Sequence, residues 1–231
     1  MTISLVIPAY NEEKFLPKTL AAIANLTRKP DEFILIDGGS TDATAKIAKE
    51  AGARVVTIPH RGIGFARQRG VLAAKGDVVA FTDADTQVPP AWLANIEETL
   101  SRPGVVATYS HYTVAGGWWV YRFIINYLQV PWMHVMEVFG LPIAPGQNTA
   151  FWKNKALEVG GYPEDFLSAE DLEMARRLLK VGKVVYRPDN AVFSDSRRGD
   201  EGIKIFPRMA GVLFRYFVFR KADTSSFPDI R

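Results

Sequence analysis

Short apolar runs alternate with longer amphipathic stretches along the first 110 residues of the chain. Each apolar run is four or five residues long and rich in β-branched side chains, which is typical of strands buried in a parallel sheet. The predicted strands are Ile3–Ile7, Phe33–Ile36, Arg54–Ile58, Val78–Phe81 and Val105–Tyr109. Between them, apolar residues recur at helical spacing. The predicted helices are Lys14–Leu26, Ala43–Ala51, Gly64–Ala74 and Ala91–Leu100.

This alternation predicts an α/β fold in which a mostly parallel central sheet carries helices on both faces. Ligands of such sheets bind beyond the carboxyl ends of the strands. Three polar motifs follow the predicted strands at these ends. They are Pro8-Ala9-Tyr10-Asn11-Glu12, Asp37-Gly38-Gly39-Ser40-Thr41-Asp42 and Asp83-Ala84-Asp85.

The second half of the chain departs from the strand–helix alternation. Trp118–Phe139 is very apolar, and Gly146–Trp152 reads as a loop that runs into a short strand. The remaining predicted elements are a helix at Ser168–Val181, strands near Lys183–Arg187 and Ala191–Ser194, and a helix at Ile203–Phe219. Because no clean linker separates the halves, we expect residues 1–231 to form one domain of two lobes, 1–110 and 111–231.

Two carboxylates one residue apart, Asp83 and Asp85, end the predicted strand Val78–Phe81. Such charges must stay in water, be paired or hold a cation. Hard divalent cations prefer oxygen ligands and commonly share them with substrate phosphates. The pair therefore favours a metal–diphosphate site over a simple polar loop.

Two further motifs place acids at helix starts. In Asp37–Asp42, Ser40 or Thr41 can cap the following helix, and this ordinary turn explains every residue except Asp37. Glu170-Asp171 follows Ser168, which can cap the helix that the two acids open. A carboxylate at a cleft-facing helix start can alternatively act as a general base on a hydroxyl group.

Composition narrows the function classes. The 231 residues are 48% hydrophobic, enough for a sizeable core, and the net charge of +3 is too small to argue for a nucleic-acid partner. The absence of cysteine excludes disulfides, a thiolate nucleophile and a Cys-ligated metal. The histidines His60, His111 and His134 match no metal-ligand spacing, although His111 follows a predicted strand and can reach the cleft.

The N-terminus and the longest apolar runs bear on localisation. The first residues run directly into a strand without the basic region of a signal peptide, and no apolar stretch is long enough to span a bilayer. We therefore expect a cytoplasmic protein, peripheral on the cytoplasmic face of the membrane if its apolar helices bind lipid.

Taken together, the ordered motifs resemble glycosyltransferase family 2, the nucleotide-sugar-dependent enzymes of GT-A fold, from residue 3 to about residue 198. The segments that carry the resemblance are Val6–Glu13, Ile34–Asp42, Ala66–Gly70 with Gly76-Asp77 and Asp83–Asp85, and Gly146–Phe151 with Gly160-Gly161-Tyr162 and Glu170-Asp171-Leu172. Ordered spacing of four motifs makes the resemblance specific.

The resemblance implies a GT-A-like αβα sandwich with a nucleotide-sugar lobe (1–110) and an acceptor lobe (111–231). It further implies metal-dependent, inverting transfer of a sugar from a nucleoside-diphosphate sugar to a lipid or glycan acceptor. Asp85 would bind Mg²⁺ or Mn²⁺, and Asp171 would deprotonate the acceptor. The nucleotide-sugar side would comprise Pro8, Ala9, Tyr10, Glu12, Asp37, Arg67, Asp83 and Ala84, and the acceptor side Gln147, Asn148 and Glu170.

The chain departs from the family pattern in two places. Many relatives carry a second acid where this chain has Gly38, so recognition of the base differs here. Many also carry a His after the last strand as a third metal ligand; here either the metal has fewer protein ligands or Asp195 takes that position. Arg197 or Arg198 can clamp the diphosphate as a planar fork. The alternative is that both arginines are solvated loop charges.

Trp118–Phe139 contains three tryptophans and one narrow polar stripe, Arg122, Asn126 and Gln129. Pro131 is expected to interrupt the helix. The segment is too polar and broken to span a bilayer, yet too apolar for an ordinary surface helix. It favours a helix that lies on a membrane surface, with sheet cover or a homodimer contact as the alternatives.

The last predicted helix, Ile203–Phe219, gathers Lys204, Arg208 and Arg215 on one face and apolar residues on the other. A basic amphipathic helix beside an aromatic one favours an anionic membrane and a lipid acceptor such as a polyprenyl phosphate. A phosphate acceptor is already ionised, so Asp171 would then position it rather than deprotonate it.

Two other function classes are open. One is a nucleotide-sugar-binding partner subunit that does not catalyse transfer. The other is a nucleotidyltransferase, against which stands the lack of a glycine-rich basic loop after the first strand. No G-x-G-x-x-G motif follows that strand, which disfavours a dinucleotide oxidoreductase.

Overall fold

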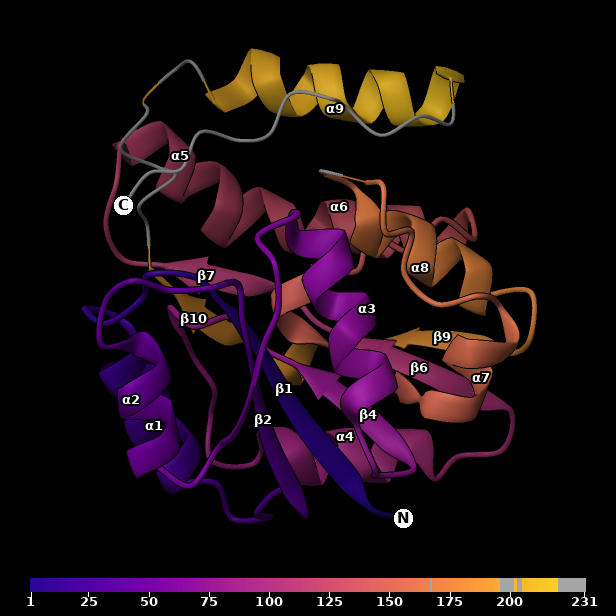
Figure 1. The fold of residues 1–231 in the computed structure, drawn as a ribbon. Coiled ribbons are helices and arrows are strands. Elements are labelled where there is room, and N and C mark those ends of the chain that lie inside the picture. The colour runs from indigo at the N-terminus through magenta and orange to yellow at the C-terminus, as the bar shows by residue number, and fades with distance from the viewer. Residues whose placement is uncertain (167, 196–201, 203–204, 220–231) are drawn as a thin grey trace.

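The computed structural model of the chain describes residues 1–166, 168–195, 202 and 205–219 (Figure 1). Its centre is a seven-stranded sheet in the order β3-β2-β1-β4-β8-β6-β9. The strands are β1 (Ile3–Ala9), β2 (Glu32–Asp37), β3 (Arg54–Thr57), β4 (Val78–Phe81), β6 (Val105–Tyr109), β8 (Thr149–Trp152) and β9 (Lys183–Tyr186). β8 runs antiparallel to both of its neighbours, and the other pairings are parallel. The prediction of a mostly parallel central sheet is confirmed.

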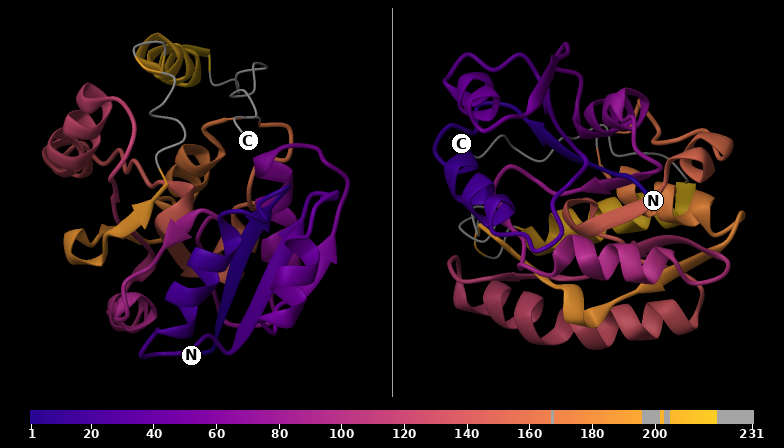
Figure 2. Two further views of the ribbon diagram at one scale, coloured as in Figure 1. Left: turned by 90° about the vertical axis from the view of Figure 1, so that its left-hand side faces the viewer. Right: turned by 90° about the horizontal axis from the view of Figure 1, so that it is seen from below.

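Helices cover both faces of this sheet, as alternation of buried side chains along the strands requires (Figure 2). Leu5 of β1 belongs to the core on one face of the sheet, and Val6 belongs to the core on the opposite face. The first face carries α1 (Leu16–Ala24), α2 (Thr44–Glu50) and α4 (Trp92–Leu100). The second carries α3 (Ile63–Ala73), α7 (Lys153–Glu158) and α8 (Glu170–Leu178).

The second half of the chain contributes to the same sheet as the first. β8 lies between β4 and β6, with Thr149 opposite Phe81, and β9 forms the edge beside β6. The short helix η2 (Gly146–Asn148) precedes β8 and thereby reaches the carboxyl end of β4. The two expected lobes thus share one hydrogen-bonded sheet.

A second, three-stranded sheet continues from the end of β4. It consists of β5 (Thr86–Gln87), β10 (Val192–Ser194) and β7 (Tyr112–Val114). Ser194 of β10 pairs with Thr86 of β5, and the Asp195 N–H donates to the Asp85 carbonyl at 3.0 Å. The short helix η3 (Pro188–Asn190) leads into β10. The central sheet thus holds the chain before Asp85, through β4, and the second sheet holds the chain after it, through β5.

The aromatic segment forms α5 (Trp119–Phe123), the π-helical turn η1 (Ile124–Leu128) and α6 (Gln129–Val138). The expectation that Pro131 interrupts the helix is wrong, because the backbone stays helical through it. The wider π turn comes just before this proline, which has no N–H to donate to the preceding turn.

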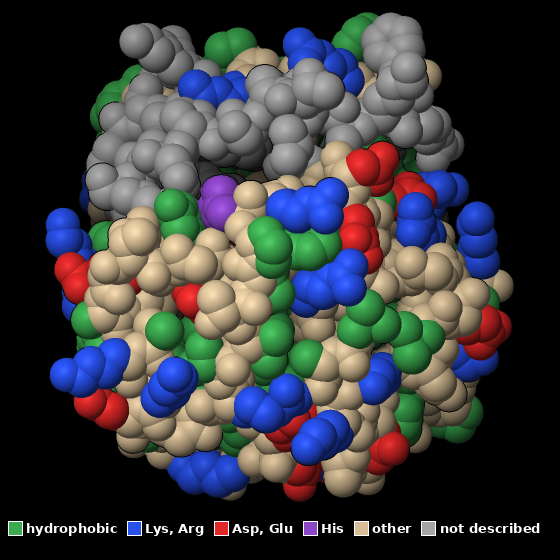
Figure 3. Space-filling model, in the orientation of Figure 1, with side chains coloured by type: hydrophobic (Ala, Val, Ile, Leu, Met, Phe, Trp, Pro, Cys, Tyr) green, Lys and Arg blue, Asp and Glu red, His purple; other side chains and the backbone are tan. Residues whose placement is uncertain are grey.

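The last helix, α9 (Ile205–Phe219), crosses the end of the molecule at the top of Figure 1. No helix among the described residues combines the length and the apolar character needed to cross a bilayer. On the face coloured in Figure 3, Lys and Arg side chains are interspersed with Asp and Glu, in line with the small net charge of +3.

Candidate active site

The Asp83-Ala84-Asp85 motif forms the turn between β4 and β5, and a hydrogen bond from α1 holds it in place. Ala84 is buried, and its carbonyl accepts the Thr19 hydroxyl of α1 at 2.8 Å. The side chain of Asp83 bonds to Arg67, and Asp85 is half-buried beside the end of β10. The two carboxylates therefore have different neighbours, as expected for a strand whose side chains alternate in direction.

Arg67, on α3, is 4% exposed and lies between two carboxylates. Its Nη2 donates to Asp83 Oδ1 at 3.0 Å, and its Nη1 donates to Glu170 Oε1. Burial opposes the guanidinium charge, but Asp83 and Glu170 outweigh it and raise the pKa of Arg67. The resemblance implies that Arg67 belongs to the nucleotide-sugar side; in this structure its guanidinium joins the motif after β4 to the start of α8.

Glu170, the first residue of α8, is buried in this cluster. Burial, followed by the nearby Asp171 carboxylate, raises its pKa to about 7, although Arg67 acts in the opposite direction. One guanidinium faces both Asp83 and Glu170 here, so a proton on Glu170 relieves the excess negative charge.

Asp171, the second residue of α8, is tied to the loop before β8. Its Oδ2 accepts the Gly146 N–H at 2.9 Å and its Oδ1 accepts the Leu172 N–H at 2.8 Å. The expected Ser168 cap is wrong: the residue before α8 is Ala169, in the left-handed conformation with φ of 58°. That turn carries the Ser168 hydroxyl into the interior, where it has no partner among the described residues.

Glycines permit the close approach of these segments. A Cβ on Gly146 would lie 1.8 Å from Arg67 Nη1, so a larger residue would have to displace the guanidinium. A Cβ on Gly64 of α3 would lie 2.6 Å from the Pro163 carbonyl oxygen. The cluster of Arg67, Asp83, Glu170 and Asp171 thus depends on two positions without side chains.

The expected nucleotide side lies at the ends of β1 and β2. Pro8 and Ala9 are buried in β1, and Ala9 pairs with Asp37 at the end of β2. Asp37 is also buried, and its Oδ1 accepts the Ser40 N–H at 3.0 Å. Tyr10 follows β1 at this edge and is half-buried.

His60 is a neighbour of this side that sequence reasoning missed. Its ring stacks on that of Tyr10 with centroids 4.1 Å apart, and its Nδ1 lies 3.3 Å from where a Cβ on Gly38 would be. The spacing of His60 to the other histidines indicated no role in the site. Its place just after the predicted strand Arg54–Ile58, at a carboxyl strand end, was the available signal.

The loop after β1 is held by the turn after β2. The Asn11 N–H donates to Ser40 Oγ, and the Thr41 N–H donates to Asn11 Oδ1, both at 2.9 Å. The Glu12 N–H donates to Thr44 Oγ1 at 2.7 Å. Asp42, rather than Ser40 or Thr41, accepts the Thr44 N–H at the start of α2, which corrects the expected cap.

Of the two loop residues expected on the acceptor side, Gln147 is half-buried and Asn148 is buried. Asn148 Oδ1 accepts the Trp92 indole N–H, and its Nδ2 donates to the carbonyls of His111 and Asn190, each at 2.9 Å. Asn148 therefore fixes the loop that carries Gly146. The residues Arg197, Arg198 and Lys204 lie outside the described part of the chain.

The family description Glycosyl transferase family 2 matches residues 4–159, about two thirds of the chain. The chain belongs to glycosyltransferase family 2. The family that the ordered motifs predicted is thereby confirmed.

Two curated relatives illustrate the sequence similarity of this family 2 chain. An uncharacterized glycosyltransferase of Mycobacterium tuberculosis is 35% identical over 130 residues, 56% of this chain and 58% of that protein. The undecaprenyl-phosphate 4-deoxy-4-formamido-L-arabinose transferase of Pectobacterium atrosepticum is 39% identical over 111 residues, 43% of this chain and 34% of that protein. The matched regions thus span little more than half of one relative and a third of the other.

The fold of this family 2 chain is similar to that of a mannosyltransferase from Pyrobaculum calidifontis, solved with GDP-Man and Mn²⁺. The TM-score is 0.76 at 23% identity, over 98% of this chain and 66% of the other. The GT-A-like αβα architecture is thereby confirmed.

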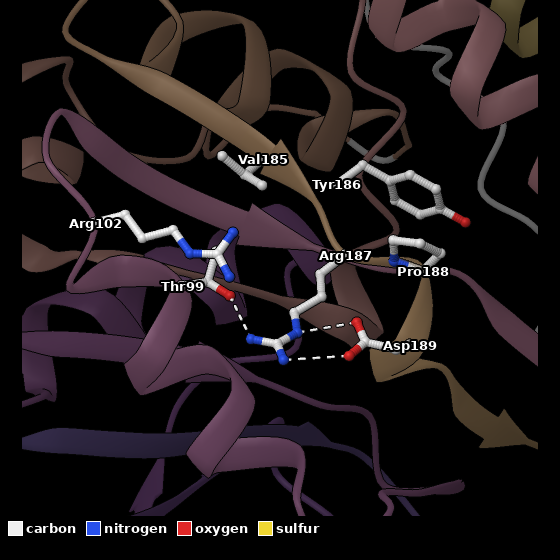
Figure 4. A pocket seen from close by; sticks show the side chains of 7 residues that line it. All are labelled: Thr99, Arg102, Val185, Tyr186, Arg187, Pro188 and Asp189. Atoms are coloured by element: carbon white, nitrogen blue, oxygen red, sulfur yellow. Dashed lines mark hydrogen bonds and ion pairs between the residues drawn. The ribbon is translucent and has the colours of Figure 1, made fainter.

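A pocket of about 200 Å³ lies by the carboxyl end of β9 (Figure 4). Arg187 donates to Thr99 Oγ1 at 2.9 Å and pairs with Asp189 at 3.0 Å. Arg102 pairs with Glu98 at 2.7 Å. Because both arginines there are paired with acids, we do not assign this pocket to the site.

The described residues contain no group of three or more His, Asp or Glu side chains placed to hold a metal ion. Asp85 nevertheless fits a hard cation, because its carboxylate is half-buried at a strand end and its flanking chain is fixed by Asp195. Mg²⁺ is commonly bound through one or two carboxylates together with substrate phosphates. The donor set is thus compatible with a metal whose shell is completed by a diphosphate.

Proposed function

We propose that the chain transfers a sugar from a nucleoside-diphosphate sugar to an acceptor, with inversion at the anomeric carbon and with a divalent metal ion. The observation that carries this proposal is the Asp83–Arg67–Glu170 chain of ion pairs. It links the carboxylate motif after β4 with the helix that begins Glu170-Asp171. Donor and acceptor groups held at these two ends would meet in one site.

On the donor side, Asp85 would hold Mg²⁺ or Mn²⁺, and the half-exposed Asp83 would accept hydrogen bonds from ribose or sugar hydroxyls. When bound, the metal supplies positive charge that offsets the charge developing on the leaving diphosphate. Tyr10 would contact the nucleoside, with Pro8, Ala9, Glu12 and Asp37 shaping its pocket.

On the acceptor side, Asp171 would take the proton from an acceptor hydroxyl as its oxygen attacks the anomeric carbon. The bond from that carbon to the diphosphate oxygen breaks in the same displacement, which inverts the configuration. The hydrogen bond from the Gly146 N–H to Asp171 Oδ2 supports this role, because it leaves the carboxylate oriented. Gln147, two residues before β8, would contact the acceptor.

For the acceptor we propose a membrane lipid such as a polyprenyl phosphate. The relative from Pectobacterium atrosepticum is named for an undecaprenyl-phosphate acceptor, and this supports the class without fixing the lipid. A phosphate oxygen is already ionised, so Asp171 would then position the acceptor. The transfer would take place at the cytoplasmic face of the membrane.

A thermal-shift screen tests the donor half of this proposal. The chain is heated with each common nucleoside diphosphate and its sugars, with and without Mn²⁺. A ligand that binds only the folded state raises its stability by about 2.7 kcal/mol at one hundred times the Kd. We expect one nucleotide family to raise the Tm in the presence of Mn²⁺. No shift with any nucleotide would contradict the proposal, and binding without donor consumption would favour a non-catalytic subunit.

A further inference from the structure

The outward side of α5, η1 and α6 is an apolar surface rich in aromatic rings. Trp119 is 66% exposed, Tyr127 is 67% exposed and Val138 is 84% exposed. We call the exposed apolar residues from α5 to the end of α6 the aromatic face. They are Trp119, Phe123, Tyr127, Leu128, Trp132, Val135, Val138 and Phe139. Large apolar patches of this kind on a protein surface mark binding sites.

The inward side of the same helix is apolar as well. Tyr121, Ile125, Met133 and Met136 are buried against the rest of the molecule. The aromatic face is therefore not needed to attach the helix to its own fold. A helix that is apolar all round is stable only when its outer side is also covered.

The exposed charged side chains of α5, η1, α6 and α9 are all basic. Arg122 of α5 and Arg215 of α9 are exposed, whereas Glu137 of α6 is half-buried and accepts the Tyr186 N–H. No other acid occurs in the sequences of α5, η1, α6 and α9. The surface is thus complementary to a negatively charged partner.

The position of α9 connects this surface to the active site. Figures 1 and 2 show α9 running alongside α5 and α6 at the same end of the molecule. Phe214 and Val218 of α9 are exposed, and the Tyr216 hydroxyl donates to Glu173 Oε2 of α8 at 3.0 Å. Since α8 begins with Glu170-Asp171, the apolar surface adjoins the acceptor side.

We propose that α5, η1, α6 and α9 form a docking surface for an anionic lipid bilayer. The Trp119, Tyr127 and Trp132 rings would sit at the level of the headgroups, where amphipathic aromatic side chains are favoured. Arg122 and Arg215 would bind lipid phosphates. This inference rests on the proposed function insofar as a lipid acceptor would reach Asp171 from the docked side.

A second copy of the chain is a poorer occupant of the aromatic face. A two-fold interface pairs a patch with itself. It would bring Arg122 and Arg215 toward their own copies, while these helices offer no exposed acid to match them. An anionic bilayer would bury the apolar side chains and would also place negative charge next to Arg122 and Arg215.

Co-sedimentation with vesicles tests the proposal, using the full chain without donor or acceptor. Vesicles of phosphatidylglycerol and phosphatidylcholine are compared with pure phosphatidylcholine at low and at high salt. We expect at least about ten-fold stronger binding to the anionic vesicles, weakened by salt. Trp119→Ser with Trp132→Ser should weaken binding at least about ten-fold, and Arg122→Glu with Arg215→Glu should remove the preference for anionic lipid.

Leu157→Ser provides the matched control, because Leu157 is a comparably exposed apolar residue on α7, away from this surface. Thermal unfolding verifies that every variant is folded, and light scattering reports the oligomeric state. Equal vesicle binding by the tryptophan variant and the control would overturn the proposal. So would a wild-type dimer that the tryptophan changes dissociate while no vesicle binds.

The outcome is separable from that of the proposed function. A wild-type chain that binds no vesicles but keeps Mn²⁺-dependent nucleotide binding would reject the docking surface and leave the transferase proposal standing. Vesicle binding without any nucleotide binding would do the reverse.

Discussion

Arg67 Nη2 donates to Asp83 Oδ1 at 3.0 Å from a side chain that is 4% exposed. The same guanidinium bonds to Glu170, 103 residues further along the chain. One buried cation thereby joins the Asp83-Ala84-Asp85 turn to the start of α8.

Arg67→Ala should lower the free energy of unfolding by about 3–5 kcal/mol, because it leaves Asp83 and Glu170 without their buried cation. Arg54→Ala is the control, since Arg54 pairs with Glu32 near the surface at 2.7 Å and should contribute about 0–1 kcal/mol. Urea unfolding of both variants measures the two effects. Equal losses would mean that the Arg67 cluster is not energetically distinct from a surface pair.

Gly146→Ala should destabilise the protein by about 1–3 kcal/mol and reduce activity, because its Cβ would lie 1.8 Å from Arg67 Nη1. Gly211→Ala in α9, where nothing lies within 4 Å of the added Cβ, should be neutral or stabilising by up to about 1 kcal/mol. Tm values of the two variants give the comparison. A harmless Gly146→Ala would show that the guanidinium can move without loss.

Glu170 should make the protein less stable as pH rises toward neutrality. Its pKa of about 7 in the folded state is above the ordinary carboxyl value of 4.5. Between these values the folded state binds more protons than the unfolded state, so stability falls with increasing pH by at most about 1.4 kcal/mol per pH unit. The contribution is fully present below pH 4.5 and lost above pH 7.

Glu170→Gln removes this titration. In metal-free buffer, the difference in unfolding free energy between wild type and variant should therefore change between pH 4.5 and pH 7 and be constant above it. A difference that is flat across the whole range would show that the pKa of Glu170 is the same in the folded and the unfolded protein.

Asp171→Asn should affect transfer according to the acceptor. With a hydroxyl acceptor, loss of a general base should lower kcat by about 10²–10⁴-fold. With a phosphate acceptor the fall should be smaller, because no proton has to be removed, and the amide oxygen of Asn can still accept the Gly146 N–H. A wild-type rate with a hydroxyl acceptor would exclude Asp171 as the base.

The sequence was sufficient for the strand framework because the strands are short, continuous apolar runs. Val78–Phe81 and Val105–Tyr109 have the predicted bounds. The sequence also showed where β4 ends, because the charged side chains of Asp83 and Asp85 are not accommodated inside a parallel sheet.

The pairings at the site could not be read from the chain. The burial of Arg67 depends on Gly146 and Glu170, which approach it only when β8 and α8 have packed. The Ser168 cap failed because the left-handed turn at Ala169 is a tertiary feature. His60 was missed because its stacking on Tyr10 joins loops from two strands that are not sequential neighbours.

Calorimetric titration of a nucleoside diphosphate, with and without Mn²⁺, tests the central claim of a metal–diphosphate site most directly. Wild type is compared with Asp85→Ala and with Asp77→Ala, which removes an acid at the opposite end of β4. Mn²⁺ should tighten binding at least about ten-fold in wild type and in Asp77→Ala, and it should have no effect in Asp85→Ala. Undiminished Mn²⁺-dependent binding by Asp85→Ala would contradict the account.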